Sequence, residues 1–293
     1  TVMSDSSIHG EQKIGSGYRA TGDYRYRVEM VTPKLTYAEL PKLQECVRQV
    51  RHAGAKANSS CGIHIHVGAE RFTAKTLRNL VNIMASKEDM IYRALQINPS
   101  RESRYCRKTN TAFLKDLNRK KPVTLDGIAN LWYQEAPYGR NHHYNSTRYH
   151  GLNLHATFTK GTVEFRLFNG TLHAGEIKAY IQFCLAMTAQ ALNQRSASPT
   201  KTQSSNEKYT FRVWLLRLGM IGDEFKTARQ HLLDHLEGCI AWKDPAQAQR
   251  QKERLREKRE AERQQTQAPP EEAVPETEME AEDEQSPAFT MSM

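Results

Sequence analysis

Two histidines placed two positions apart are the first residues in this sequence with clear chemical potential. His64 and His66 belong to Cys61–Val67, a β-rich run that predicts a strand. Side chains at i and i+2 of a strand share a face, so both imidazoles can reach one metal ion or nucleotide. The plain alternative is a pair of partly exposed histidines. A zinc site that also uses Cys61 is conceivable, but no fourth ligand stands nearby in the sequence.

A carboxylate and a guanidinium are paired in the same way further along the chain. Glu164 and Arg166 lie in Gly161–Phe168, which also predicts a strand. Alternation places both on one face together with Phe168. The pair can hold a hard divalent metal and a phosphate, or it can be a structural salt bridge. The other face is apolar and carries Val163, Phe165 and Leu167.

A third acidic residue stands among strand-forming apolar residues. Glu29 lies within Tyr24–Thr32, whose alternation predicts a strand that Pro33 ends. Acidic residues are depleted in strands, so Glu29 requires a partner. We therefore expect three strands to bring polar, ligand-type side chains to one face of a sheet.

The elements around these strands predict an α+β class, in which an antiparallel sheet has flanking helices. Leu152–Phe158 and Gly161–Phe168 read as a hairpin joined by Thr159 and Lys160. Residues 98–147 form a basic, irregular insertion with room for two short helices. Helices are expected at 41–53, at 73–95 with Thr73 as N-cap, and at 174–192, 207–219 and 222–241.

Composition separates a folded body, residues 1–243, from a tail, residues 244–293. The chain carries a net charge of +9, but residues 245–293 hold 7 Lys/Arg and 12 Asp/Glu, which leaves +14 on the body. The tail is too poor in apolar residues to fold by burial, so we expect a solvated charged helix at 249–265 and disorder at 266–293. A basic body suits nucleic acid, a polyphosphate or an acidic substrate.

Cysteine usage and hydropathy give the expected compartment. The five cysteines form no CxxC pair, which favours free thiols over a disulfide framework or a zinc knuckle. No apolar run approaches the roughly 20 residues that span a membrane, and no signal peptide is visible at the N-terminus. We therefore expect a cytoplasmic protein without a membrane partner.

Four short motifs, in order, resemble the amidoligase family, a divergent branch of carboxylate–amine ligases with a glutamine-synthetase-like fold. Asn58–His66 also resembles the Asn-Gly-Ser-Gly-Met-His-x-His signature of glutamine synthetases, and Val163–Arg166 resembles their Glu-x-Arg strand. The family resemblance covers roughly residues 2–190. Its motifs are Val28–Pro33, Cys61–Gly68, Arg148–Leu154 and Val163–Thr171.

The resemblance implies an ATP-dependent ligase that joins a small-molecule or peptide carboxylate to an amine through an acyl phosphate. By this resemblance Glu29, His64 and Glu164 hold Mg²⁺ or Mn²⁺, and His66 lies near the nucleotide. Arg148 and Arg166 bind the phosphates of ATP and of the intermediate. Hard carboxylate ligands suit these metals, and arginine forks bind phosphate in two places at once.

One departure from the family pattern leaves alternatives open. The family begins with a Gly-x-Glu-x-Glu strand, which is absent here, so we expect an N-terminally incomplete sequence that lacks two metal ligands. A non-catalytic relative of the fold is one alternative. A nucleic-acid-binding module is another, because the stretch from Arg101 to Tyr149 interleaves basic and aromatic residues. The identities of the carboxylate and amine, and the oligomeric state, are not encoded in any motif.

Overall fold

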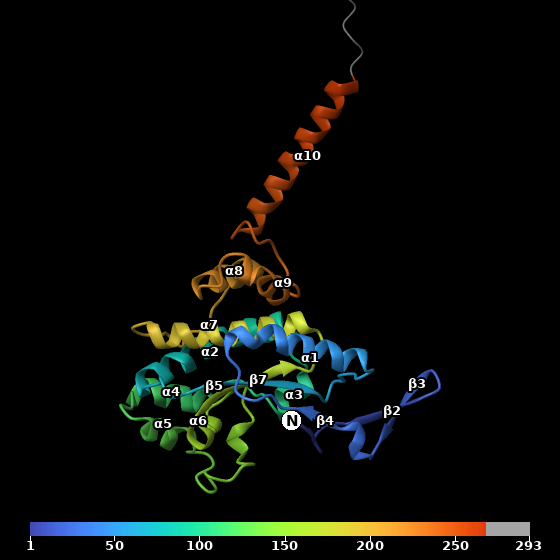
Figure 1. The fold of residues 1–293 in the computed structure, drawn as a ribbon. Helices are drawn as coiled ribbons and strands as arrows, with labels where there is room; N and C mark the ends of the chain where they lie inside the picture. The colour runs from blue at the N-terminus through green and yellow to red at the C-terminus, as the bar shows by residue number, and fades with distance from the viewer. Residues whose placement is uncertain (268–293) are drawn as a thin grey trace, which may run out of the picture. The chain divides into compact units, whose positions relative to one another are not determined.

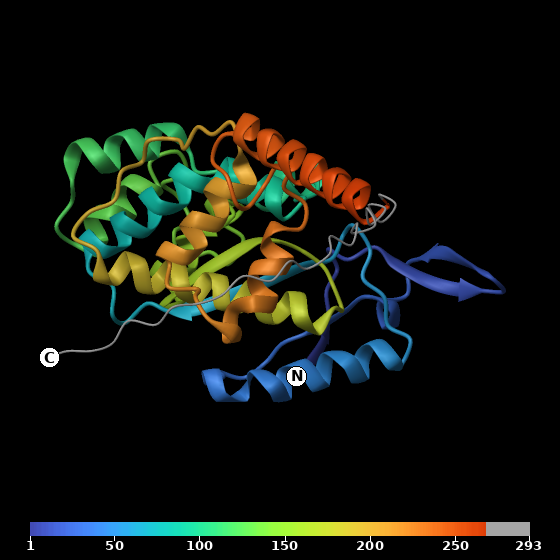
Figure 2. The ribbon, with the colours of Figure 1, turned by 90° about the horizontal axis from the view of Figure 1, so that it is seen from above.

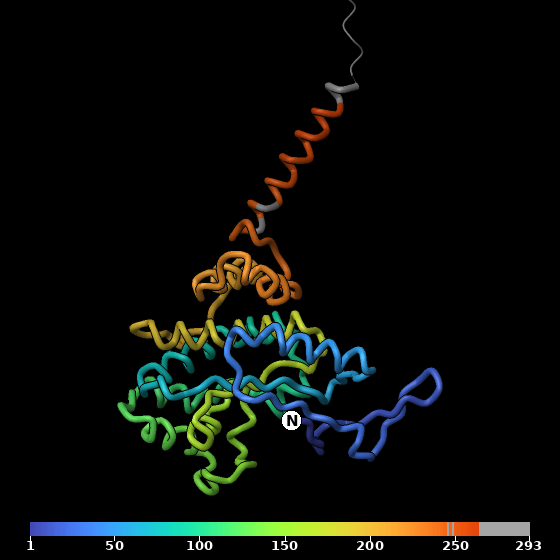
Figure 3. Tube along the Cα trace, in the orientation of Figure 1, coloured from blue at the N-terminus to red at the C-terminus, as the bar shows by residue number. Residues whose placement is uncertain are grey.

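The computed structural model describes residues 1–267, and its contacts divide the chain into two units (Figures 1 and 3). The first unit is Thr1–Ala248, and the second begins at Gln249. All the motifs discussed above lie in the first unit. The predicted disorder of residues 266–293 falls almost entirely outside the described residues.

A three-stranded antiparallel sheet, in the order β5-β7-β6, forms the centre of the first unit. β5 is Gly62–Gly68, β6 is Leu152–Asn153 and β7 is Thr162–Asn169. β7 is the middle strand, and its residues 163–168 are all buried, as expected for a strand paired on both sides. The α+β class with antiparallel sheets and flanking helices is confirmed.

An irregularity between β5 and β7 changes which face some side chains occupy. Ile65 pairs with Phe165, but Ile63 pairs with Phe168, so the register shifts between them. Phe168 stacks on Tyr180 of a covering helix, with ring centroids 4.4 Å apart. Its expected place beside Glu164 and Arg166 was wrong, because a bulge breaks the two-residue alternation.

The N-terminal strands form two small sheets of their own. β1 (Val2–Ser4) pairs with β4 (Val28–Met30), and β2 (Gly10–Ile14) pairs with β3 (Gly17–Thr21). The β2–β3 hairpin projects from the rest of the unit in both views (Figures 1 and 2). The expected strand Tyr24–Thr32 was therefore too long, because its first residues form a 3-10 turn, Tyr24–Tyr26, capped by Asp23.

Helices cover one face of the central sheet. α2 (Ala74–Ala94) and α7 (Ala174–Asn193) pack against each other, and α7 also contacts β5 and α1 (Leu40–His52) (Figures 1 and 2). The Thr73 side chain accepts a hydrogen bond from the backbone of Thr76, which confirms the predicted N-cap of α2. α8 (Glu207–Arg217) and α9 (Lys226–Leu233) complete this side, and α9 packs on α7.

Residues 98–147 are more regular than the sequence suggested. They contain α3 (Pro99–Arg104), α4 (Thr111–Lys120), α5 (Leu125–Trp132) and the start of a 3-10 turn, η3 (Ser146–Arg148). Several of their apolar side chains belong to the main core, namely Phe113, Leu117, Ile128, Trp132 and Tyr133. This stretch is thus part of the body, and three of its aromatic side chains are used for packing.

The predicted hairpin of Leu152–Phe158 with Gly161–Phe168 was wrong in its first arm. β6 ends after Asn153, and a short helix, α6 (His155–Lys160), leads back into β7. Gly161 ends that helix with φ +67°, a left-handed conformation that favours glycine. The Asn153 side chain accepts a hydrogen bond from the backbone N–H of His155, so a local side-chain contact turns the chain from strand to helix.

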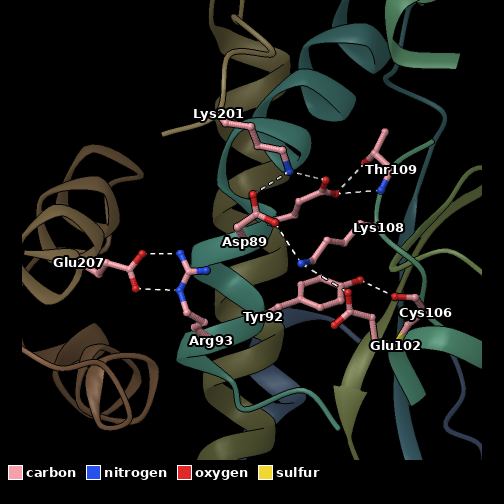
Figure 4. A network of polar contacts seen from close by, with 10 residues as sticks. Asp89, Tyr92, Arg93, Glu102, Cys106, Lys108, Thr109, Lys201 and Glu207 are labelled. Atoms are coloured by element: carbon pink, nitrogen blue, oxygen red, sulfur yellow. Dashed lines mark hydrogen bonds and ion pairs between the residues drawn. The ribbon is translucent and has the colours of Figure 1, made fainter. Parts of the chain in front are cut away.

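A polar network ties the segment before α8 to the buried side of α2 (Figure 4). Glu88 is buried, and its carboxylate accepts hydrogen bonds from the backbone and hydroxyl of Thr109 (both 2.9 Å) and from Lys201 (2.7 Å). Lys201 also pairs with Asp89, which pairs with Lys108. The network satisfies the buried charge of Glu88 with partners from two segments that are distant from it in sequence.

The second unit begins within α10 (Pro245–Gln267), which confirms the charged helix expected at 249–265. Its described side chains are exposed, and Leu255 is its large apolar residue. Arg256 pairs with Glu260, and Lys258 with Glu262, four residues apart along the helix. Among the residues described, no helix combines the length and apolar character needed to cross a bilayer.

Candidate functional site

The carboxylate of Glu164 lies at the centre of the candidate site, because its strand is the middle one of the sheet. His66 of β5 pairs directly with Glu164 from one side, and Asn153 of β6 pairs with it from the other. Directly opposed residues on one sheet face bring their side chains into contact. Glu164 is only 3% exposed, so its negative charge needs several partners.

Both histidines approach the same oxygen of Glu164. Nδ1 of His64 and Nε2 of His66 each lie 3.6 Å from Oε1 of Glu164. The other ring nitrogen of His66 lies 2.8 Å from the hydroxyl of Thr162, which fixes the orientation of that ring. The predicted common face of His64, His66 and Glu164 is present.

Both imidazoles are neutral at neutral pH. Burial, and then the positive charge of Arg166, lower the pKa of His64 to about 3, against a smaller opposing effect of Glu164. Burial also lowers the pKa of His66, while Glu164 opposes this shift. The His64 side chain is still 31% exposed, so its desolvation comes from the crowded protein around the ring rather than from complete enclosure. A neutral imidazole is the form that binds a metal.

Arg166 neutralises Glu164 directly. Its Nη1 donates to Oε1 of Glu164 at 2.8 Å, both side chains are buried, and its Nε donates to the carbonyl of Tyr105. The pKa of Glu164 is lowered: burial acts to raise it, but Arg166, the two histidines and Asn153 outweigh burial. The structural salt bridge considered from the sequence is therefore present, at the same place as the ligand-type residues.

Asn153 is a site residue that the sequence analysis did not single out. Its Nδ2 donates to Oε2 of Glu164 at 2.5 Å, and the residue is 1% exposed. A signal was available, because Asn153 is a polar residue between Leu152 and Leu154 in a predicted strand. The hydrogen bond holds the carboxylate so that its Oε1 faces Arg166 and the two histidines.

Arg148 lies at the edge of this cluster. Its Nη1 donates to the carbonyl of His143 at 2.9 Å, and its guanidinium lies over the rings of Tyr144 and Tyr149. Arg166 lies over the same Tyr149 ring, 5.8 Å from its centroid. The pKa of Arg148 is lowered, first by burial and then by the positive charge of the nearby Arg166. Arg148 makes no ion pair with a carboxylate among the described residues.

Arg101 is a second residue that the sequence analysis missed. Arg101 lies in α3 and is 3% exposed. Its guanidinium donates to the carbonyls of Ser60 and Phe168, while its Nε has no hydrogen-bond partner among the described residues. A Cβ on Gly62 would lie 2.1 Å from its Nη2, so the glycine before Ile63 leaves the space that the guanidinium fills. Within residues 1–267 no carboxylate pairs with Arg101, and its charge lowers the pKa of His64.

Glu29 reaches the neighbourhood of the site from a different sheet. It lies on β4, which pairs with β1 and not with the central sheet, so the expectation of three strands in one sheet was wrong. The pKa of Glu29 is raised overall, first by burial and then by the negative charges of Asp5 and Glu164. The positive charges of Lys160 and Arg166 oppose this shift. Glu29 is thus within electrostatic reach of Glu164 and Arg166, although it makes no hydrogen bond to them.

The donor atoms of these residues are not gathered into one compact group. Within residues 1–267, the ligand atoms of Glu29, His64, His66 and Glu164 do not form a group of three or more that all lie within 4.8 Å of one another. Such a group exists elsewhere in the described structure and contains none of these four residues. Cys61 is absent from it too, and its Sγ lies 3.7 Å from the side-chain oxygen of Asn58. A zinc site of Cys61 with the two histidines therefore has no support in the geometry.

Carboxylate oxygens and neutral imidazoles nevertheless suit a hard divalent cation. Around them stand the cations Arg101, Arg148, Arg166 and Lys160. This arrangement is equipped to bind a metal together with an anion that carries several negative oxygens. Two cavities, of about 390 and about 700 Å³, lie elsewhere, and neither is lined by His64, His66 or Glu164.

Comparison with known proteins assigns the chain to a family. Residues 1–188 match the family described as "Putative amidoligase enzyme". The matched range contains every candidate site residue and ends within α7. No curated protein and no solved structure matches the chain.

Proposed function

The chain belongs to the amidoligase family, and from that premise we propose that it is an ATP-dependent ligase that joins a carboxylate to an amine. The observation that carries the proposal is the meeting of Arg166, His64, His66 and Asn153 on one buried carboxylate, Glu164. Arg101 and Arg148, which donate to backbone carbonyls and pair with no carboxylate in the described part of the chain, provide for an anionic substrate. The proposed scaffold is the glutamine-synthetase-like fold.

Glu164, Glu29 and His64 are the residues that would hold Mg²⁺ or Mn²⁺. The donor set fits, because two carboxylates and a neutral imidazole suit these cations. When bound, the cation would shield the negative oxygens of the phosphates. Asn153 keeps Glu164 oriented, and Thr162 keeps His66 oriented, in the role of supporting hydrogen bonds.

Arg166, Arg148 and Arg101 would bind phosphate oxygens, with His66 beside the nucleotide. A substrate carboxylate oxygen attacks the γ-phosphorus of ATP, the bond from that phosphorus to ADP breaks, and an acyl phosphate forms. The amine nitrogen then attacks the acyl carbon, loses a proton and expels phosphate. Negative charge develops on the transferring group, and fixed guanidinium groups stabilise it without reorganisation.

We favour the ligase over the nucleic-acid alternative, because part of the aromatic surface of the basic stretch is used in the core. Phe113, Trp132 and Tyr133 of the basic stretch are buried in the core, so they are not available to stack on bases. Tyr138 and Tyr144 are exposed, but they lie in an irregular loop and not on a common sheet face. The positive surplus is better matched to phosphates at the site.

The first test measures nucleotide binding by the full chain, because this needs no knowledge of the substrate. Titration with ATP and Mn²⁺ should show binding that Arg166→Lys weakens on the order of 10²-fold, since lysine cannot supply a planar fork. Arg119→Lys is the matched control, as Arg119 is exposed and pairs with Asp116. Equal affinities of the two variants would make Arg166 a structural residue only.

The second test measures chemistry with a panel of carboxylates. Hydroxylamine replaces the unknown amine, so that an acyl phosphate is trapped as a hydroxamate, and release of ADP and phosphate is followed. Transfer of ¹⁸O from the carboxylate into phosphate would report the acyl phosphate itself. Formation of AMP and pyrophosphate would overturn the proposed mechanism.

A further inference from the structure

A second group of ligand-type side chains lies where α7 begins and α9 crosses it. His173, Glu176 and His231 each present one ligand atom, and these atoms all lie within 4.8 Å of one another. The two imidazole rings meet edge to face, with centroids 5.0 Å apart. Within residues 1–267, these are the His, Cys, Asp and Glu side chains whose ligand atoms lie this close together in a group of three. The group shares no residue with the candidate ligase site.

The local backbone leaves room for the two rings to converge. Gly175 stands between His173 and Glu176, and a Cβ at this position would lie 3.0 Å from Nε2 of His231 and 3.0 Å from Cε1 of His173. Any other residue would push into the space that the imidazoles occupy. His173 is the N-cap residue of α7 and Glu176 lies in its first turn, whereas His231 comes from α9, so the group joins two helices that pack on each other.

From this geometry we propose that His173, Glu176 and His231 form a binding site for Zn²⁺ or a similar transition-metal ion. Two imidazoles and one carboxylate are a ligand set that zinc uses with a fourth, exchangeable position. Imidazole ligands select transition metals over Mg²⁺, so this site and the candidate ligase site differ in the cation they prefer.

The donors need only a small contraction to bind an ion. Zinc lies about 2.0–2.2 Å from nitrogen and oxygen ligands, which places tetrahedral donors about 3.4 Å apart. His173 is exposed, and Glu176 and His231 are half-buried, so rotation of their side chains meets little resistance. Nδ1 of His173 accepts the backbone N–H of Glu176 and so caps α7, and coordination through this atom exchanges that hydrogen bond for a metal bond.

The fourth position would open toward a cavity. Gly175 and Ala228, neighbours of the ligands in α7 and α9, line a cavity of about 390 Å³ together with Lys178 and Glu224. An ion at this place would fasten α9, which lies beyond the family-matched residues 1–188, to the end of the strand–helix unit that carries the ligase motifs.

The test is a Zn²⁺ titration of the metal-free full chain in excess Mg²⁺, in which calorimetry measures binding. Co²⁺ replaces Zn²⁺ in a second titration as a visible probe of coordination. Wild type should bind one ion at this site and give the d–d bands of a tetrahedral nitrogen–oxygen site. His231→Gln should lose that equivalent or weaken its affinity at least on the order of 10-fold, because removing a direct ligand should exceed the loss seen for outer partners. His235→Gln is the control, since His235 is exposed and four residues away.

Thermal unfolding gives a second readout. Zn²⁺ should raise the unfolding midpoint of wild type and of His235→Gln, and leave that of His231→Gln unchanged, because an ion that binds only the folded state stabilises it. If His231→Gln does not fold, Glu176→Gln removes a ligand with less change in size. Equal Zn²⁺ stoichiometry, affinity and midpoint shift in the ligand variant and the control would overturn the site.

Discussion

At the scale of single residues, the candidate site is organised by one buried carboxylate and the groups that compensate it. Glu164 has Arg166 at 2.8 Å, two neutral imidazoles at 3.6 Å and the amide of Asn153 at 2.5 Å. Removing one partner of a buried ion pair leaves an uncompensated charge, which costs far more than the pair itself contributes. The residues are therefore coupled in stability as well as in any chemistry they perform.

A double-mutant cycle should reveal this coupling. Glu164→Gln and Arg166→Met should each lower the free energy of unfolding by about 3–5 kcal/mol, and the double variant by clearly less than the sum. Urea denaturation measures all four states of the cycle. The exposed pair Glu45–Arg48 is the matched comparison, with an expected coupling below about 1 kcal/mol. Equal coupling in the two pairs would contradict the buried-charge account.

His150 offers a test of pH dependence outside the cluster. Its Nδ1–H donates to the carbonyl of Thr147 at 2.8 Å, its ring meets the edge of Trp132, and burial lowers its pKa despite that hydrogen bond. The unfolded chain takes up the proton first as the pH falls. The contribution of His150 to stability is thus complete above about pH 6.5, the unperturbed pKa, and declines below it.

His150→Gln should therefore flatten the pH dependence of stability. Between about pH 6.5 and pH 5, the free energy of unfolding should fall less steeply in this variant than in wild type. Urea denaturation at several pH values measures the slopes. His235→Gln, at an exposed position, should keep the wild-type slope. A slope unchanged by His150→Gln would mean that the histidine is protonated as readily in the folded state as in the unfolded one.

At the scale of elements, positions are set by strand register and by polar networks between segments. The bulge between β5 and β7 lies opposite His64. Because of it, Phe168 points toward α7 and not to the sheet face that carries Glu164 and Arg166. Glu88 of α2 accepts hydrogen bonds from Thr109 and Lys201, which belong to segments distant from it in sequence (Figure 4). Both features depend on contacts between elements and not on local propensity.

Glu88 should matter more to stability than its neighbour Asp89. Glu88→Gln should lower the free energy of unfolding by about 1–3 kcal/mol, because a buried acceptor loses its charge-assisted hydrogen bonds. Asp89→Asn should cost below about 1 kcal/mol, because that side chain is 39% exposed and its ion pairs are solvated. Urea denaturation of the two variants compares them directly. An equal cost would show that burial does not determine the strength of this network.

At the scale of the whole molecule, the chain is a folded body followed by a polar helix. The body ends at Ala248 by contacts, and its core draws on residues as late as Leu236. α10 is charged or polar around its described circumference, with Leu255 exposed. A helix without an apolar face has little to gain from packing.

Truncation should separate these two parts. A chain that ends at Ala248 should keep the wild-type midpoint of unfolding and the same nucleotide affinity, because the residues after Ala248 that the structure describes contribute no core side chain. A chain that ends at Arg229 should be strongly destabilised, because it loses the buried Leu232, Leu233 and Leu236. Thermal and urea unfolding compare the two shortened chains. A lowered midpoint for the first truncation would show that the charged helix supports the body.

The sequence by itself determined the elements whose signals are local. The spacing in Cys61–Val67 predicted β5 and the common face of its histidines, Thr73 marked the start of α2, and the lack of apolar residues marked the tail helix. These succeed because periodicity and capping act over a few residues. The family motifs likewise named Glu164 and Arg166 in one strand.

Only the tertiary structure decided which distant residues meet. Asn153 and Arg101 join the site because β6 pairs with β7 and because Gly62 leaves space for a guanidinium from α3. Glu29 belongs to a separate sheet, and the expected strand after Asn153 is a helix, although both segments carried strand-like residues. The physical reason is that pairing partners, bulges and buried charges depend on contacts between segments far apart in the chain, which local periodicity does not contain.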